Sequence, residues 1–80
     1  MAEEIQVTQT LDAKGLCCPI PILKTKRAID GMAKDEVLKV LTTDPGSQKD
    51  MPAWARRTGN ILLKVEETPG VLAFYIRKAD

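Results

Sequence analysis

Histidine is absent from the 80 residues of this chain. Its absence excludes a Ser-His-Asp triad, a Cys-His dyad and an imidazole metal ligand formed within the chain. Cysteine is scarce as well, since the chain holds two, Cys17 and Cys18, side by side. Adjacent thiols lack the paired spacings of a zinc site, so we expect chemistry based on thiols, carboxylates or amines.

Net charge is nearly lacking too, because 12 Lys and Arg residues oppose 11 Asp and Glu residues and leave +1. General nucleic-acid-binding domains usually carry a larger basic excess. Aromatic residues make up 4% of the chain and consist of Trp54, Phe74 and Tyr75. These are too few to build base-stacking platforms, so we expect no direct nucleic-acid partner.

Long apolar runs are also missing, which argues against a membrane span. The first residues, with Glu3 and Glu4, lack the basic and apolar regions of a signal peptide. A disulfide between adjacent cysteines would be strained and would close no loop, so the pair Cys17 and Cys18 indicates a reducing compartment. We therefore predict a cytoplasmic protein without membrane contact, forming one domain over residues 1–80.

Hydrophobic periodicity and Gly or Pro punctuation divide the chain into six elements. Strands are predicted at residues 5–11, 36–43, 61–67 and 71–78, and helices at residues 19–31 and 47–58. Residues 12–16 are predicted to form a turn. Pro52 allows the second helix to begin near Asp50 instead of Ser47. In each strand, side chains are predicted to alternate strictly between the two faces of the sheet. In the third strand, one face receives Ile61, Leu63 and Val65, and the other receives Leu62, Lys64 and Glu66.

The resulting order, βαβαββ, predicts an α/β (α+β) two-layer sandwich. Each helix returns the chain to the same end of the sheet, so the first strands run parallel, and the short turn at Pro69 and Gly70 makes the last pair antiparallel. We therefore expect a four-stranded mixed sheet with two helices on one face. The other face meets solvent.

Chemistry is concentrated where the first helix begins, at Cys18-Pro19-Ile20-Pro21. Cys18 is predicted at the helix N-cap, where the macrodipole favours the thiolate. Pro19 and Pro21 stiffen the first turn but remove two donors, so we expect a thiol pKa only somewhat below the reference of about 8.5. Nearby Lys14, Lys24 and Arg27 add positive charge.

The residues alone leave structural interpretations open. Free cysteines are usually buried as small apolar residues, which applies to Cys18 and more strongly to Cys17. The basic residues Lys24, Lys26 and Arg27 form either a solvated helix face or a docking patch for acidic partners. In the second helix, Asp44 is predicted as an N-terminal cap, Ser47 and Asp50 as a capping pair, and Trp54 as a core residue.

Two segments resemble the TusA/SirA sulfur-carrier family. Residues 11–21, with Cys18-Pro19-Ile20-Pro21 after Leu11-Asp12-Ala13-Lys14-Gly15-Leu16, are similar to its opening signature. Residues 44–52, from Asp44-Pro45 to Asp50-Met51-Pro52, are similar to its second signature, with Met51 where isoleucine is usual. The resemblance covers nearly the whole chain. Cys17, just before the motif cysteine, is a further thiol with a possible minor part.

The resemblance implies a sandwich like the C-terminal domain of bacterial translation initiation factor three, and a persulfide on Cys18 with no other cofactor. It implies a cysteine desulfurase or rhodanese-type sulfur donor and an acceptor of the TusBCD or DsrEFH type. Such relays end in tRNA 2-thiolation, molybdenum cofactor synthesis or dissimilatory sulfur oxidation. A persulfide carrier acts within a relay, and its thiolate attack on a sulfur–sulfur bond requires no histidine.

Two rival functions fit the residues less well. One is a regulatory module that binds RNA or protein, with Cys18 structural. The other is a redox sensor, for which the adjacent Cys17 is a poor resolving thiol. A carrier that visits several partners is expected to be monomeric when free, although a sheet face presenting Leu62 and Tyr75 offers a surface for pairing.

Overall fold

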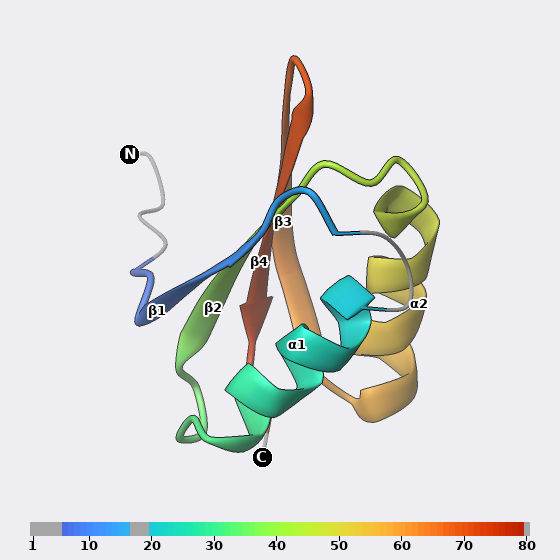
Figure 1. The fold of residues 1–80 in the computed structure, drawn as a ribbon. Helices are drawn as coiled ribbons and strands as arrows, with labels where there is room; N and C mark the ends of the chain where they lie inside the picture. The colour runs from blue at the N-terminus through green and yellow to red at the C-terminus, as the bar shows by residue number, and fades with distance from the viewer. Residues whose placement is uncertain (1–5, 17–19, 80) are drawn as a thin grey trace.

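The computed structural model describes residues 6–16 and 20–79. The elements follow the order βαβαββ, as the sequence predicts (Figure 1). Their bounds are β1 Gln9–Ala13, α1 Ile20–Asp30, β2 Val37–Thr42, α2 Ser47–Thr58, β3 Ile61–Thr68 and β4 Val71–Arg77. The second helix thus begins at Ser47 and contains Pro52, so the alternative start near Asp50 is wrong.

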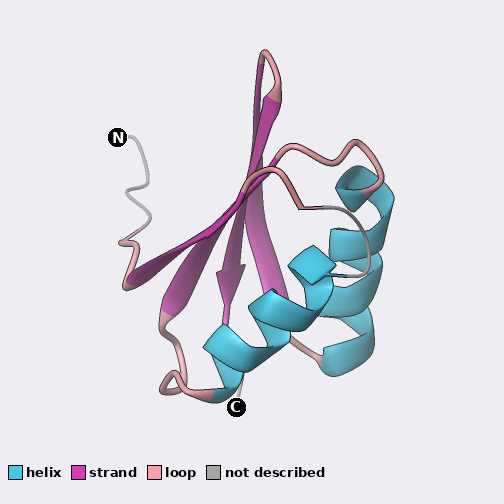
Figure 2. Cartoon of the chain, viewed as in Figure 1, coloured by secondary structure: helices cyan, strands magenta, loops and turns pink. Residues whose placement is uncertain are grey.

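The four strands form one mixed sheet in the order β1-β2-β4-β3. Strand β1 is parallel to β2, whereas β4 is antiparallel to both β2 and β3. The two helices lie on the same side of the sheet (Figure 2), which confirms the predicted two-layer sandwich. The central place of β4 fits its composition, because residues 72–76 are buried on both faces and an edge position would expose them.

The main core lies between the helices and the sheet. Leu38 and Val40 of β2 and Phe74 of β4 are completely buried there, against Met51 and Trp54 of α2. Val37 and Leu41 belong to the opposite face, so the predicted faces of β2 are confirmed. Trp54 is confirmed as a core residue.

Strand β1 lies further along the chain than the sequence predicts. The prediction placed it at residues 5–11 with a turn from Asp12, but the pairing with β2 continues through Asp12, opposite Leu41, and Ala13, opposite Thr42. Ala13 is completely buried. Parallel pairing with β2 and the burial of this small apolar side chain therefore outweigh the local turn tendency of the segment.

Strand β3 does not keep strict alternation. Leu62 lies opposite Ile76 and Lys64 lies opposite Tyr75, so Leu63 is an additional residue that forms a β-bulge. Leu62 consequently packs against the helix-side core. The predicted surface that joins Leu62 with Tyr75 is wrong, because the bulge places these side chains on opposite faces of the sheet.

The face without helices has a small core of its own. Val37, Ala73 and Tyr75 are buried there, with Leu41 packed against them. The Tyr75 hydroxyl donates a hydrogen bond to the Glu66 carboxylate, and Lys39 Nζ lies 5.4 Å from the Tyr75 ring centroid. Since Tyr75 is only 8% exposed, this face offers no free aromatic ring for pairing.

Candidate functional site

Two loops meet at the carboxyl ends of the parallel strands β1 and β2 and lead into α1 and α2 (Figure 1). This edge is the usual place for sites in sheets with parallel strands. The predicted site residues Cys17, Cys18 and Pro19 lie outside the described residues, so the N-cap position of Cys18 stays a prediction. Their flanking residues are described: Leu16 packs against the core and Ile20 begins α1.

The loop after β1 is held by its backbone amides. The Lys14 N–H donates to Asp12 Oδ1 at 3.0 Å, and the Leu16 N–H donates to the Ala13 carbonyl at 3.3 Å. Between them, the Gly15 N–H donates to Thr43 Oγ1 at 2.9 Å. Gly15 has a φ of 81°, which favours glycine over any other residue. The chain therefore approaches the cysteine segment from a position tied to the second loop.

The loop after β2 is also held by backbone amides that donate to side-chain oxygens, and here one of the acceptors is buried. Thr42 Oγ1, which is buried, accepts the Asp44 N–H at 3.1 Å and lies 3.3 Å from the Ser47 hydroxyl. Asp44 Oδ1 accepts the Gly46 N–H at 3.1 Å. Together these bonds order the turn that precedes α2.

The predicted caps of α2 are wrong. The N-cap residue is Gly46, and no side chain caps the helix with a hydrogen bond. Ser47 is already helical, and its hydroxyl is buried beside Thr42. The Asp44 carboxylate accepts the N–H of Gly46 in the turn, before the first helical residue, Ser47. At the other end Gly59 caps the helix: it has a φ of 81°, which glycine adopts readily, and donates its N–H to the Arg56 carbonyl.

The start of α1 is anchored by Pro21. Its side chain is buried, and its carbonyl accepts a 2.7 Å hydrogen bond from the Thr25 hydroxyl, also buried. A proline in the first turn costs no helix hydrogen bond, because the first amides of a helix have no acceptor within the helix. Pro21 thus fixes the inner side of the helix start while the outer side stays free.

The outer side of α1 carries four exposed residues at positions i, i+3, i+4 and i+7. They are Ile20, which is 41% exposed, Leu23, which is 55% exposed, Lys24 and Arg27. At this spacing they form one stripe, called here the α1 stripe. Ile20 and Leu23 are not among the residues predicted from the sequence, although apolar residues at outward-facing helix positions indicate a contact surface.

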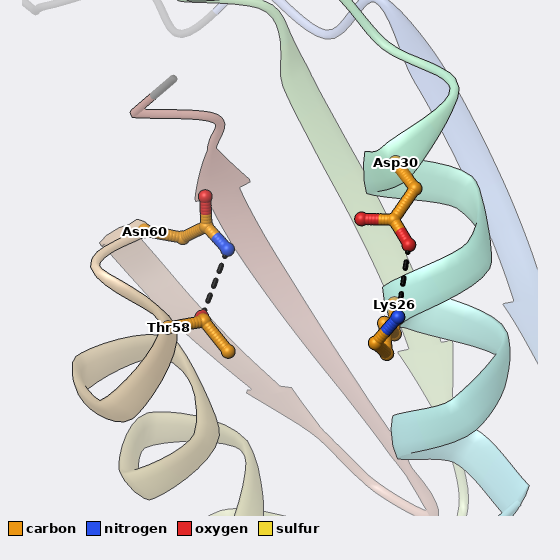
Figure 3. Close-up of polar contacts among 4 residues, drawn as sticks. All are labelled: Lys26, Asp30, Thr58 and Asn60. Atoms are coloured by element: carbon orange, nitrogen blue, oxygen red, sulfur yellow. Dashed lines mark hydrogen bonds and ion pairs between the residues drawn. The ribbon is translucent and has the colours of Figure 1, made fainter.

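Lys26 lies beside the α1 stripe and differs from the other two predicted docking cations. Its Nζ forms an ion pair with Asp30 Oδ2 at 3.0 Å (Figure 3). Both side chains are about 60% exposed, so the pair adds little stability. Its effect is to compensate the charge of Lys26, which leaves Lys24 and Arg27 as the cations of the stripe.

A small cleft of about 170 Å³ adjoins the second loop. It lies between this loop and the β3–β4 turn, and its walls include Thr43, Pro45 and Leu72. Gln48 Nε2 donates to Glu67 Oε1 at 3.0 Å at its side. Within residues 6–16 and 20–79, no group of three acidic residues is placed to hold a metal ion, and no helix is long and apolar enough to span a membrane.

Comparison with known proteins adds independent findings. The sequence model of the family Sulfurtransferase TusA matches residues 9–78. The sulfur carrier protein TusA of Allochromatium vinosum is 48% identical over 71 residues, covering 89% of this chain and 93% of that protein. A candidate sulfur carrier of Halobacterium salinarum is 46% identical over 79 residues, 98% of either chain.

Not all relatives have the same length. A candidate sulfur carrier of Aquifex aeolicus is 46% identical over 98% of this chain, but the match spans only 40% of that protein. Among solved structures, a SirA-like protein from Desulfitobacterium hafniense superposes with a TM-score of 0.78 at 27% identity. The match covers 91% of this chain and 100% of that one. The shared fold is therefore the two-layer sandwich described above.

Proposed function

The chain belongs to the TusA family of sulfurtransferases, and on this basis we propose that it is a sulfur carrier that holds sulfane sulfur as a persulfide on Cys18. The observation that carries the proposal is the start of α1. Cys18 is followed by Pro19 and then by the first helical residue, Ile20, from which the exposed α1 stripe extends. A partner that contacts the stripe is thereby brought close to Cys18, which lies only two positions before Ile20 in the sequence.

Loading is a thiolate displacement. The Cys18 thiolate attacks the outer sulfur of a donor persulfide, a new sulfur–sulfur bond forms, and the donor cysteine leaves as a thiolate with the electron pair of the broken bond. The proton of the donor persulfide stays with the transferred sulfur or goes to water. The same displacement, with Cys18 as leaving group, passes the sulfur to an acceptor thiolate, so no external oxidant or reductant is consumed.

The α1 stripe is the proposed docking surface. Lys24 and Arg27 attract acidic partner surfaces and speed the encounter, since complementary charge mainly raises association rates. Ile20 and Leu23 then lose their water in the contact, as apolar residues at the centre of an interface do. Lys26 takes part at the margin, where Asp30 weakens its field.

The proposed partners are a cysteine desulfurase or rhodanese-type donor and an acceptor of the TusBCD or DsrEFH type. The sulfur then serves tRNA 2-thiolation, molybdenum cofactor synthesis or sulfur oxidation. We propose that residues 1–80 act in the cytoplasm as a single domain, as a monomer between encounters, and as a relay member. No cofactor other than the persulfide sulfur is required by this chemistry.

The rival function of RNA binding has less support. Trp54, Phe74 and Tyr75 are 5%, 0% and 8% exposed, so none of the three aromatic rings is available for stacking on a base. The redox-sensor alternative predicts a different product, because oxidation of Cys17 and Cys18 removes two hydrogens while loading adds sulfur.

Mass spectrometry after incubation with a persulfide donor tests the proposal. The wild-type protein should gain the mass of sulfur on Cys18, Cys18→Ser should gain none, and Cys17→Ser should retain most of the loading. If Cys17→Ser alone lost loading, the carrier residue would be Cys17 instead of Cys18. No addition to the wild-type protein, or a loss of two hydrogens, would support a rival function.

A further inference from the structure

Three consecutive amides precede the cysteine segment, and each donates a hydrogen bond. The bonds of Lys14 and Leu16 reach acceptors two and three residues back, within the end of β1. The bond of Gly15 reaches Thr43 Oγ1, 28 residues along the chain, at 2.9 Å. Of the three bonds, this one ties the loop to a different element.

Thr43 is itself held on both sides. Thr42 is paired with Ala13 in β1 and with Leu72 in β4, and it is completely buried. Its hydroxyl accepts the Asp44 N–H, on the far side of Thr43. The Thr43 side chain is exposed, so no packing requires a threonine there. The Thr43 hydroxyl is therefore attached to a backbone that is held in place, and it accepts a hydrogen bond from the loop that leads to Cys18.

The other end of the bond has a matching constraint. Gly15 adopts a φ of 81°, and a Cβ added there would meet no atom within 4 Å. A substitution at Gly15 would therefore act through backbone conformation and not through a clash. Both Thr43 and Gly15 can be altered without disturbing the core, which makes the bond accessible to experiment.

We propose that Thr43 is a positioning residue for sulfur transfer: its hydroxyl holds Gly15 and thereby sets the path by which the chain approaches Cys18. The proposal rests on the carrier function proposed above. When the hydroxyl is removed, the loop is distributed over more conformations, and the rate falls with the fraction that remains competent. A single hydrogen bond changes the equilibrium constant between competent and other conformations by about three- to tenfold.

The test uses three variants, each combined with Cys17→Ser so that one thiol is measured. Thr43→Val removes the acceptor at nearly constant shape, and Thr43→Ser restores it. Thr68→Val is the matched control, because it removes an exposed threonine hydroxyl that bonds the Val71 carbonyl at 3.1 Å in the β3–β4 turn. Hydrogen exchange of the Gly15 amide, alkylation of the Cys18 thiol by iodoacetamide and persulfide transfer from a protein donor are measured.

Thr43→Val should speed exchange at Gly15 and slow persulfide transfer, and the two factors should multiply to about three- to tenfold, because one reports the open fraction and the other the competent fraction. It should also change the alkylation rate, and the melting temperature should fall only by the few degrees expected for one hydrogen bond. Thr43→Ser should restore wild-type behaviour, and Thr68→Val should match the Cys17→Ser parent.

Two outcomes would overturn the inference. One is faster exchange at Gly15 with unchanged alkylation and transfer, which would make the bond purely structural. The other is an equal effect of Thr68→Val. Failure of the carrier function is distinguishable, because the parent protein would then take up no sulfur, while exchange and alkylation would still report whether Thr43 holds the loop.

Discussion

The two loops at the carboxyl ends of β1 and β2 precede the two helices, yet they are built differently. The loop before α1 is held by amides whose side-chain acceptors, on Asp12 and Thr43, are exposed, and the helix then presents an exposed apolar and basic stripe. The loop before α2 is held by an amide that donates to the completely buried Thr42 hydroxyl, which also contacts the buried Ser47 hydroxyl. The loop before α2 therefore supports the fold and is called the supporting loop. The loop before α1 leads to the exposed stripe and is called the presenting loop.

The largest effect on stability should come from the supporting loop. Thr42→Val removes the acceptor of the Asp44 amide and the buried partner of the Ser47 hydroxyl, so we expect the free energy of unfolding to fall by about 1–3 kcal/mol. Denaturant titration measures it. Thr10→Val, in exposed β1, is the control and should stay within about 0.5 kcal/mol. Equal losses in the two variants would show that the Thr42 hydroxyl supports the fold no more than an exposed strand threonine does.

Changes in the α1 stripe, which follows the presenting loop, should instead affect the rate of sulfur transfer. Reversing Lys24 and Arg27 together to Glu should slow transfer between proteins by about tenfold at low salt, and the defect should shrink as salt rises. Loading from a small polysulfide should change less, because it needs no docking surface. Rates are compared at equal thiolate fraction.

The control for this reversal is Lys34 and Arg57 to Glu, which changes net charge equally away from the α1 stripe. Lys34 follows α1 at its far end, and Arg57 lies in the last turn of α2. If this control slows transfer as much, the effect belongs to overall charge and the α1 stripe is a solvated face.

A smaller effect is expected in the ionisation of the thiol itself. Alkylation of Cys18 in Cys17→Ser protein should follow a single titration with a pKa somewhat below about 8.5, because of the helix start and nearby lysines. Rates of iodoacetamide reaction between pH 6 and pH 10 measure it. A midpoint above the reference would show that loss of solvation outweighs the positive charges of the first loop.

The smallest effect should appear on the opposite sheet face, which belongs to neither loop. The Tyr75 hydroxyl, followed by the charge of Lys64, lowers the pKa of Glu66 below its ordinary 4.5. A lowered folded pKa stabilises the protein above the unfolded value, and this contribution is lost as pH falls through the folded value. Tyr75→Phe should therefore flatten the pH dependence of the denaturation midpoint below pH 5, with Lys64→Met flattening it less. Loading of Cys18 should not change.

Much of the fold was predictable from local pattern. The faces of β2, the core position of Trp54 and the Gly59 cap follow from period-two alternation, helical spacing and the freedom of glycine at positive φ. The caps of α2 were not, because Ser47 and Asp44 have the right chemistry but bond Thr42 and Gly46 instead. Local side-chain preference identifies a helix start, but packing selects the partner.

The candidate site divides in the same way. The cysteine, its prolines and the basic residues of α1 could be identified from residue type and spacing, because these are properties of a contiguous segment. Three features became apparent only in the folded chain: β4 lies between β2 and β3, β3 bulges at Leu63, and Gly15 donates a hydrogen bond to Thr43. Each of these depends on which distant segments pair, and that choice is made by the burial of whole strands and loops together, which no local stretch of sequence encodes alone.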